Sequence, residues 1–310
     1  MRNALVEWLI AKGDNDKRVI LLTADLGYSV LEKYAERFSD RFVNVGVAEQ
    51  NMAGIAAGMA MEGLLPYTYS IGIFPSFRCA EQIRNDIDYH QLPVVTCSIG
   101  SGVAYGNLGY SHHAIQDLSL MRCLPNMVIA TPADPLEVRK ALDWHYDNPC
   151  PMYLRLHKVG EPKLSLDKSP LGLGEVCCLW SPNSDISSTD SAKICIMAIG
   201  HIAEKVVAIS KEKESLVPVY SVPLWGKPAN EFFSSRLSEF DIVITVEDHI
   251  LEGGFGSYAM EVAAMKSLKT RVIPVALGSN VIGCVAREET LLKPLLQDLE
   301  SLLLSEGCLN

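Results

Sequence analysis

One carboxylate in the sequence stands where a strand is predicted to pass into a helix. Glu49 follows the glycine turn at Gly46, and it begins a predicted helix made largely of Ala and Gly. The small side chains of that helix allow another backbone to approach closely. A carboxylate in this place can take part in proton transfer with a bound ligand. The alternative interpretation is structural, because an acidic side chain near a helix N-terminus stabilises the helix by about 0.3–1 kcal/mol.

Two further groups of residues could bind a ligand. Phe74 and Phe77 lie three positions apart at a predicted strand-to-helix turn, so both rings can pack on a flat heterocycle or, equally, in an ordinary core. Four glycines and the pair His112 and His113 follow the predicted strand that ends at Ile99. Loops at the carboxyl ends of parallel strands bind ligands in α/β sheets, and His exchanges protons near neutral pH. The pattern alone leaves both a functional and a structural role open for these histidines.

These residues need regular elements to position them. Strands alternate with helices along the chain, which predicts a mostly parallel α/β fold. In the first half, the predicted strands are Arg18–Thr23, Phe42–Val45, Pro66–Ser70, Pro93–Ile99, Met127–Thr131 and Met152–Leu156. The helices predicted between them are Asn3–Lys12, Glu49–Glu62, Ser76–Tyr89, Ile115–Cys123 and Pro135–Tyr146. Together they predict a first domain over residues 1–160.

Residues 161–191 are rich in Pro, Ser, Asp and Gly and are predicted to be a linker. A second α/β domain is predicted over 192–310. Its glycine turn at Gly253–Ser257 precedes a helix, where it could hold an anion or simply allow close packing. The predicted strands are Ile194–Ile199, Val217–Ser221, Asp241–Val246 and Arg271–Val275. The predicted helices are His201–Lys211, Phe232–Leu237, Tyr258–Met265 and Thr290–Leu304.

Length, charge and cysteine usage exclude several classes of protein. The chain has 310 residues, enough for about two domains, and 48% hydrophobic and 21% charged residues are ordinary for a globular enzyme. A net charge of −10 argues against nucleic-acid binding. The nine cysteines lack metal-binding spacing, and the sequence shows neither a secretory signal nor an apolar run of about 18 residues. We therefore expect reduced thiols, a cytoplasmic location and no membrane span.

Taken in order, these stretches resemble transketolase and its relatives over nearly the whole chain, from Arg2 to about Leu277. The most specific segments are NVGVAEQNMAGIAAGMA, EQIRNDIDYHQLPV and GYSHHAIQDLSLMRCLPNMVIATPADPLEV. A further segment, VEDHILEGGFGSYAMEV, resembles the C-terminal domain of that family. The resemblance implies a pyrimidine-binding α/β domain, whose parallel sheet has helices on both faces, and then a smaller α/β domain. It also implies thiamine diphosphate as the cofactor.

The resemblance assigns cofactor contacts residue by residue. Glu49 resembles the glutamate that hydrogen-bonds the pyrimidine ring and promotes the tautomer that removes the thiazolium C2 proton. Phe74 and Phe77 resemble the aromatic side chains that pack on the pyrimidine, and the family's third aromatic is an alanine in this chain. Asp25 and Leu26 resemble cofactor contacts that reach across a subunit interface.

For the substrate, the resemblance implies that His112 contacts sugar hydroxyls and assists proton transfer. Arg2, Ser29 and Lys158 fall where transketolases bind the substrate phosphate. Lys158 replaces the usual Arg, so it keeps the charge and loses the bidentate fork.

Three positions depart from the family pattern. Gly100 falls where long-chain transketolases have another phosphate-contacting His, Leu108 where they have Asp, and Tyr110 where they have Pro. Leu108 thus takes a substrate-binding position without a polar group. These departures put the usual substrate in doubt more than the reaction type.

The family's Gly-Asp-Gly motif, which holds a divalent metal on the diphosphate, has no match in this chain, since Gly13-Asp14-Asn15 lacks the second glycine. We therefore expect no metal ligand here. The chain resembles the C-terminal subunit of a split transketolase, with Mg²⁺ or Ca²⁺ held by an N-terminal, diphosphate-binding partner in a dimer of heterodimers.

The expected reaction transfers a two-carbon ketol unit from a ketose phosphate to an aldehyde. One alternative is a 1-deoxyxylulose-5-phosphate synthase-like or 2-oxo acid dehydrogenase beta-like subunit. The other is a non-catalytic regulatory subunit.

Overall fold

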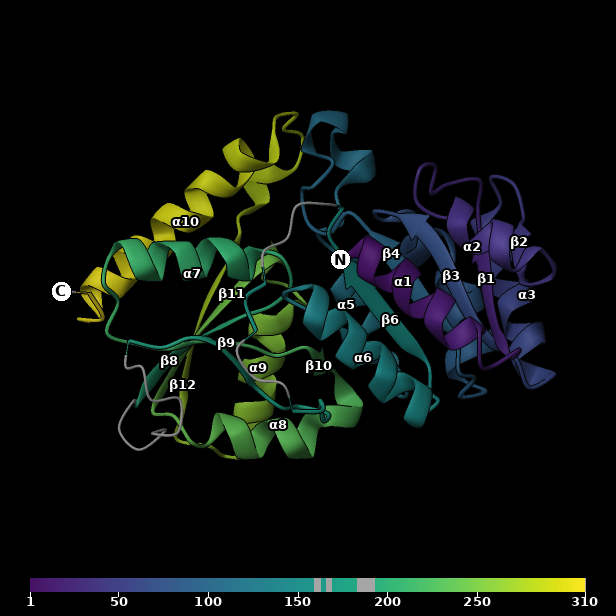
Figure 1. The fold of residues 1–310 in the computed structure, drawn as a ribbon. Coiled ribbons are helices and arrows are strands. Elements are labelled where there is room, and N and C mark those ends of the chain that lie inside the picture. Colours follow the sequence, from purple (N-terminus) through teal and green to yellow (C-terminus); the bar gives the residue numbers. More distant parts are fainter. Residues whose placement is uncertain (159–162, 166–168, 183–192, 310) are drawn as a thin grey trace.

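The computed structural model describes residues 1–158, 163–165, 169–182 and 193–309. Two sheets with flanking helices lie side by side (Figure 1). The first sheet has seven strands in the order β10-β5-β6-β4-β3-β1-β2, and each neighbouring pair is parallel except β10 with β5. The predicted mostly parallel α/β fold is therefore confirmed. The strands are β1 (Val19–Thr23), β2 (Phe42–Asn44), β3 (Leu65–Ile71), β4 (Val95–Ile99), β5 (Val128–Ala130), β6 (Met152–Leu156) and β10 (Leu224–Trp225).

Helices cover both faces of the first sheet because its strands are apolar on both sides. On one face, Leu5 of α1 and Val138 of α6 share a core with Leu21 of β1. On the other face, Met52 of α3 shares a core with Leu22 of β1. Adjacent residues of one strand thus serve opposite cores, as strand geometry requires. The helices of this unit are α1 (Arg2–Gly13), α2 (Glu32–Arg37), α3 (Glu49–Met61), α4 (Ala80–Gln82), α5 (Asp117–Met121) and α6 (Pro135–Asp147).

The second sheet has five strands in the order β12-β11-β8-β9-β7. Ile244 of β11 packs with Val206 of α7 and Leu295 of α10, while its neighbour Val243 packs in the core that contains Phe233 of α8. This sheet is therefore also covered on both faces. Its strands are β7 (Cys177–Trp180), β8 (Ile194–Ala198), β9 (Val219–Ser221), β11 (Ile242–Ile250) and β12 (Arg271–Leu277). The helices are α7 (Ile202–Glu212), α8 (Asn230–Leu237), α9 (Phe255–Met265) and α10 (Glu288–Ser305).

Two short strands depart from the predicted organisation. Cys177–Trp180, inside the segment predicted as a linker, forms β7 and pairs antiparallel with β9. Leu224–Trp225, in the predicted second domain, forms β10 and extends the first sheet. The linker prediction is wrong at β7, and β10 joins the two units through a shared sheet. Strands of two and four residues are too short to show a period in the sequence, so their partners alone define them. The domain boundaries at 160 and 192 stay a prediction.

The helix predicted over residues 76–89 is irregular. Phe74–Arg78 and Ile83–Asp88 are π-helical turns on either side of α4. Such turns occur frequently at functional sites. The first of them begins at Phe74, so this ring lies on the helix itself rather than before it.

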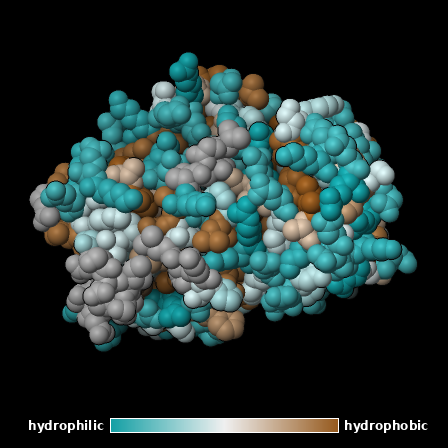
Figure 2. All heavy atoms as spheres, viewed as in Figure 1, coloured by the Kyte–Doolittle hydropathy of each residue, from teal (hydrophilic) through white to brown (hydrophobic). Residues whose placement is uncertain are grey.

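Hydrophilic side chains cover much of the face seen in Figure 2, in keeping with the net charge of −10. Hydrophobic side chains lie between them on both units. Among the described residues, no helix combines the length and the apolar character needed to cross a bilayer.

Candidate active site

Glu49 is the first residue of α3 and lies buried where the chain leaves β2. Gly46 makes the intervening turn with a φ of 73°, a conformation that glycine adopts without steric cost. The Glu49 side chain is only 3% exposed. Nη1 of Arg78 lies 3.1 Å from its Oε2, and the Ser70 hydroxyl donates to its Oε1 at 3.4 Å. The buried carboxylate therefore has a cationic and a neutral partner, as burial requires.

Arg78 also contacts the aromatic part of the site. Its guanidinium lies over the Phe74 ring, 3.9 Å from the ring centre, and Phe74 meets the His112 ring edge-on at 5.2 Å between centres. Phe77 is half exposed at the same turn. Glu49, Phe74 and His112 are distant in sequence and are linked by one guanidinium and one ring. The sequence did not predict Arg78 as a site residue, because its only local signal is its position directly after Phe77.

Asp25, Leu26 and Ser29 lie in the loop after β1, next to the strand that leads to Glu49. Asp25 and Ser29 have φ values of 56° and 63°, which are uncommon for residues other than glycine. The Asp25 amide donates to Oδ1 of Asn44 at 3.0 Å, and its carboxylate accepts from Nδ2 of the same residue at 3.1 Å. Leu26, between them in sequence, is partly buried. Because β1 and β2 are neighbours, these bonds fix the loop at the same edge of the sheet as α3.

Lys158 and Arg2 converge on Tyr105. Nζ of Lys158 lies 5.0 Å from the centre of the Tyr105 ring and donates to a backbone carbonyl at 2.8 Å. Arg2 partly offsets the increase in the pKa of Tyr105 that burial causes, so its charge lies near the same ring. A Cβ at Gly100 would lie 2.1 Å from Tyr105, which therefore fills the space beside this glycine. Tyr105 in turn lies 6.4 Å from the His112 ring, centre to centre.

Leu108 and Tyr110 lie on a loop that is open to solvent, with exposed fractions of 51% and 48%. The Tyr110 hydroxyl accepts a hydrogen bond from Nε2 of Gln116 at 3.0 Å. The second unit holds the base of this loop, because the Ala286 amide donates to the carbonyl of Gly106 at 3.2 Å. Neither side chain has a fixed place in a core, which leaves both available to a ligand.

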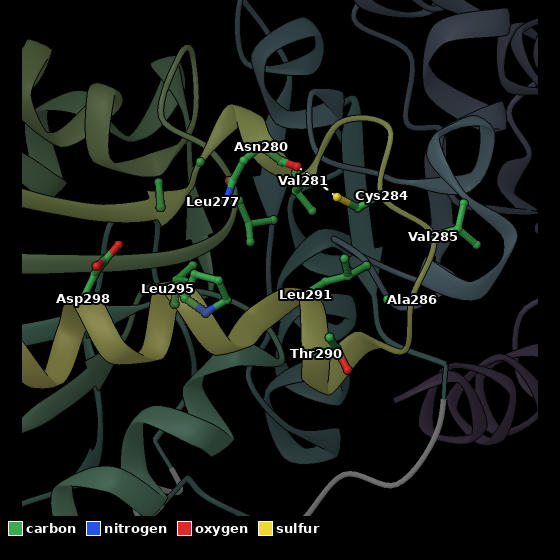
Figure 3. Close-up of a pocket in the computed structure, with 13 residues that line it drawn as sticks. Leu277, Asn280, Val281, Cys284, Val285, Ala286, Thr290, Leu291, Leu295 and Asp298 are labelled. Carbon is green, nitrogen blue, oxygen red and sulfur yellow. Dashed lines mark hydrogen bonds between the residues drawn. The ribbon is translucent and has the colours of Figure 1, made fainter.

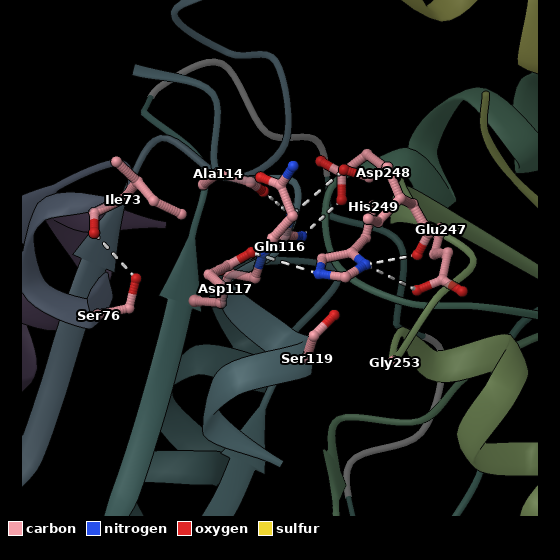
Figure 4. A network of polar contacts seen from close by, with 12 residues as sticks. Ile73, Ser76, Ala114, Gln116, Asp117, Ser119, Glu247, Asp248, His249 and Gly253 are labelled. Atoms are coloured by element: carbon pink, nitrogen blue, oxygen red, sulfur yellow. Dashed lines mark hydrogen bonds and ion pairs between the residues drawn. The ribbon is translucent and has the colours of Figure 1, made fainter. Parts of the chain in front are cut away.

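A buried polar network joins the two units behind the site. Nε of Arg155 lies 3.0 Å from Asp117 of the first unit, and its Nη1 lies 2.5 Å from Asp248 of the second. His249 lies between Asp117 and β11 (Figure 4), and burial lowers its pKa to about 4. The sequence did not predict this network, because its members come from three separate strands and helices. Its two carboxylates already pair with Arg155, so its role is structural.

The glycine turn at Gly253–Ser257 binds a carboxylate of the chain itself. The amides of Phe255 and Gly256 donate to Glu247 at 2.7 and 2.8 Å. A Cβ at Gly254 would lie 2.3 Å from an oxygen of that carboxylate, so glycine permits the close approach. Of the two interpretations of this turn, close packing is the one that the geometry supports.

A cavity of about 380 Å³ lies away from Glu49, where β12 leads into α10 (Figure 3). Its lining is mostly apolar and includes Val281, Val285, Leu291 and Leu295. None of the predicted site residues lines it. Proton transfer and phosphate binding both need polar or charged side chains at the reacting groups. We therefore place the candidate site at Glu49 and not in this cavity.

Comparison with known proteins identifies the family. The family model described as "Transketolase, pyrimidine binding domain" matches residues 1–160, more than half of the 310 residues. The chain belongs to the transketolase family. One of the two subunits of the apulose-4-phosphate transketolase of Actinobacillus succinogenes is 30% identical over 268 residues, which are 85% of this chain and 83% of that protein. The 1-deoxy-D-xylulose-5-phosphate synthase of Clostridium kluyveri is 31% identical over 265 residues, but these are only 40% of its own length.

Solved transketolase structures share the fold. One described as "Split gene transketolase, inactive beta4 tetramer" has a TM-score of 0.77 at 29% identity and is covered over 92% of its length. The transketolase of Campylobacter jejuni has a TM-score of 0.79, but at 20% identity this likeness concerns the fold alone. This chain covers 46% of the Campylobacter jejuni chain. The predicted resemblance to a split transketolase family member is therefore confirmed, while the roles of individual residues stay predictions.

Proposed function

We propose that this chain is the pyrimidine-binding subunit of a thiamine-diphosphate-dependent transketolase that works only with a diphosphate-binding partner. The reaction is transfer of a two-carbon ketol unit from a ketose phosphate to an aldehyde. The observation that carries this proposal is a buried carboxylate, Glu49, beside the ring of Phe74 and the imidazole of His112. Those three groups supply proton exchange, a flat apolar wall and a second proton carrier at one place.

The residues of the site fit the aminopyrimidine part of the cofactor. Glu49 can hydrogen-bond a ring nitrogen, Phe74 and Phe77 can pack on the ring, and the Asp25 loop lies at the same edge of the sheet. When bound, thiamine diphosphate would supply the nucleophilic carbon of the reaction. In this proposal Glu49 holds the proton at the pyrimidine nitrogen, and His112 exchanges protons with the sugar hydroxyls.

Substrate binding is proposed for the groups around Tyr105 and for the loop after β1. Arg2 and Lys158 bring two positive charges to one ring, which favours a phosphate group between them. Ser29 adds a hydroxyl from the loop after β1. The name of the Actinobacillus succinogenes relative supports a sugar phosphate as substrate.

The surface around Glu49 supports a requirement for a second chain. Tyr28 and Val47, on the loops after β1 and β2, are 75% and 76% exposed. On α3, a Cβ at Gly54 or Gly58 would meet nothing within 4 Å among the described residues, so this face of the helix is uncovered. Apolar groups gathered around a ligand site are typical of a surface that another chain covers.

The sequence supports the same arrangement, because it has no match to the Gly-Asp-Gly motif of the diphosphate site. The partner would then hold the diphosphate and its Mg²⁺ or Ca²⁺, in a dimer of heterodimers. The solved split-gene relative is itself described as an inactive tetramer of beta chains.

Reconstitution tests this proposal. The purified chain, the diphosphate-binding partner and their mixture are each incubated with thiamine diphosphate, Mg²⁺ and a panel of ketose phosphates and aldehydes. We expect two-carbon transfer by the mixture and none by either chain alone. Turnover by this chain without a partner would overturn the requirement for one. Decarboxylation of pyruvate by the mixture, without ketose turnover, would instead support the synthase-like or dehydrogenase-like alternative, and a lack of both activities would support a regulatory role.

A further inference from the structure

Two histidines and a glutamate meet where the first unit contacts the second, away from Glu49. His157 follows β6, His201 directly precedes α7, and Glu288 is the first residue of α10. One ligand atom from each of the three lies within 4.8 Å of the other two. Three separate elements therefore direct metal-ligating side chains to one point.

The cluster is buried, and its hydrogen bonds are incomplete. His157 and His201 are only 4% and 7% exposed. Nε2 of His157 lies 3.1 Å from both carboxylate oxygens of Glu288. The Nδ1 atom of each histidine is buried without a hydrogen-bond partner in the described part of the chain. Buried polar atoms of this kind are rare in native proteins, and an ion that is not part of the polypeptide is one common explanation.

The two imidazole rings are stacked, 3.7 Å apart between centres and 17° from parallel. The lone pair of each ring nitrogen lies in the plane of its own ring, so the stacked rings do not point at one common atom. A rotation of one ring about its side-chain bonds would direct a nitrogen from each histidine toward the Glu288 carboxylate. Such a rotation needs no backbone movement.

We propose that His157, His201 and Glu288 form a binding site for a divalent zinc-class cation, with water at the fourth position. Two imidazoles and one carboxylate are a known ligand set for zinc, at about 2.0–2.2 Å from the metal. Mg²⁺ prefers oxygen ligands, so this site differs in kind from the cofactor's metal site. The proposal goes beyond the proposed function and departs from the sequence-based expectation that this chain has no metal ligand.

The position of the site indicates a structural role. His157 is next to Lys158, which contacts Tyr105 and a carbonyl of the loop that follows β4. Glu288 comes shortly after Ala286, which hydrogen-bonds that same loop. A metal ion at this point would fasten α7 and α10 to the end of β6 and so hold the base of the substrate loop from both sides.

Metal titration of the full-length, tag-free chain tests the proposal without a partner or substrate. After treatment with a chelator, the chain is titrated with Zn²⁺ by calorimetry and with Co²⁺ by visible absorption, and bound zinc is counted by elemental analysis. We expect one tightly bound equivalent and a tetrahedral Co²⁺ spectrum. His201→Gln and Glu288→Gln should each weaken zinc binding by at least about 100-fold, since each removes a direct ligand.

The control is His90→Gln, which changes an exposed histidine and should leave zinc binding unchanged. Thermal unfolding provides a second readout: zinc should raise the midpoint of the wild type and of His90→Gln but not of the two ligand variants. Zinc that bound equally to all four proteins would lie elsewhere, for example on the exposed thiols of Cys123 and Cys284, and would overturn the proposal. An absence of tight binding to the wild type would do the same.

Discussion

Arg78 pairs with Glu49 at 3.1 Å and lies over the ring of Phe74 at 3.9 Å. One side chain thus touches both the proposed catalytic carboxylate and the proposed aromatic wall. Arg78 is itself about half exposed, so its guanidinium can remain hydrated while it holds these two groups. The contact makes Arg78 a positioning residue for Glu49.

Removal of Arg78 should therefore impair the assembled enzyme without unfolding the chain. We expect Arg78→Ala to reduce kcat on the order of 10²-fold, because a small misplacement of a catalytic group has an effect of that size. Arg78→Lys keeps the charge and should restore part of the rate. Arg84→Ala removes an exposed arginine from the same helical segment and is the matched control. Equal kcat for Arg78→Ala and Arg84→Ala would show that Glu49 does not depend on this contact.

Glu49→Gln tests the proton-transfer role directly. The change preserves shape and removes the carboxylate, so exchange of the cofactor's C2 proton should slow by about 10²–10⁴-fold, with a smaller loss of cofactor binding. Exchange can be followed by NMR in deuterated water. Glu62→Gln, at the exposed C-terminal end of the same helix, should behave as the wild type. Activity within about threefold of the wild type would contradict the assignment, since that is less than about 1 kcal/mol of barrier.

Leu108 should weaken the selection of acceptor aldehydes by the configuration at C2. A site that hydrogen-bonds a hydroxyl rejects substrates without one, and Leu108 offers no such bond. We expect the wild type to accept deoxy or otherwise modified acceptors, and Leu108→Asp to gain selectivity for the ordinary hydroxyl. The measurement is kcat/KM on a panel of aldehydes that differ only at C2. Tyr110 is the rival, because its hydroxyl lies on the same loop: strong wild-type selectivity that is unchanged in Leu108→Asp and lost in Tyr110→Phe would assign the role to the tyrosine.

Arg155 should be the most important single charge for stability in the network between the two units. Arg155→Ala would leave Asp117 and Asp248 buried without a countercharge, and we expect the free energy of unfolding to fall by about 3–5 kcal/mol in urea titrations. Arg139→Ala is the control, since Arg139 pairs with Glu7 at the surface and should change stability by less than about 1 kcal/mol. Similar losses for both variants would mean that the buried network carries no special weight.

Acid should destabilise the fold through its buried neutral histidines. Burial lowers the pKa of His145 from 6.5 to about 4, so the unfolded chain binds a proton at pH values where the folded chain does not. This contribution to stability is complete above pH 6.5 and is lost as pH falls toward 4, by up to about 1.4 kcal/mol for each pH unit. Glu137, whose pKa burial raises to about 7, has the opposite dependence, so the comparison needs matched variants. Between pH 7 and 5, His145→Gln should lose less stability than the exposed-site control His90→Gln.

Local sequence patterns are sufficient to define the α/β architecture and the location of the chemistry. The alternation of strands and helices is such a pattern, and it predicts β6 with its observed bounds and most other elements to within a few residues. Glu49 at the start of α3 is also visible in the sequence, because a turn glycine followed by a helix of small residues has a local signature. The resemblance to transketolases then names its neighbours in the site.

Which side chains meet depends on tertiary packing. The pairing of Arg78 with Glu49, the edge contact of Phe74 with His112 and the approach of His201 to Glu288 join residues far apart in the chain. The strands β7 and β10 are likewise defined by their partners. Periodicity in a sequence records which face of an element is buried, and it carries no information on which other element covers that face. Contacts between elements therefore become known only when the chain has packed.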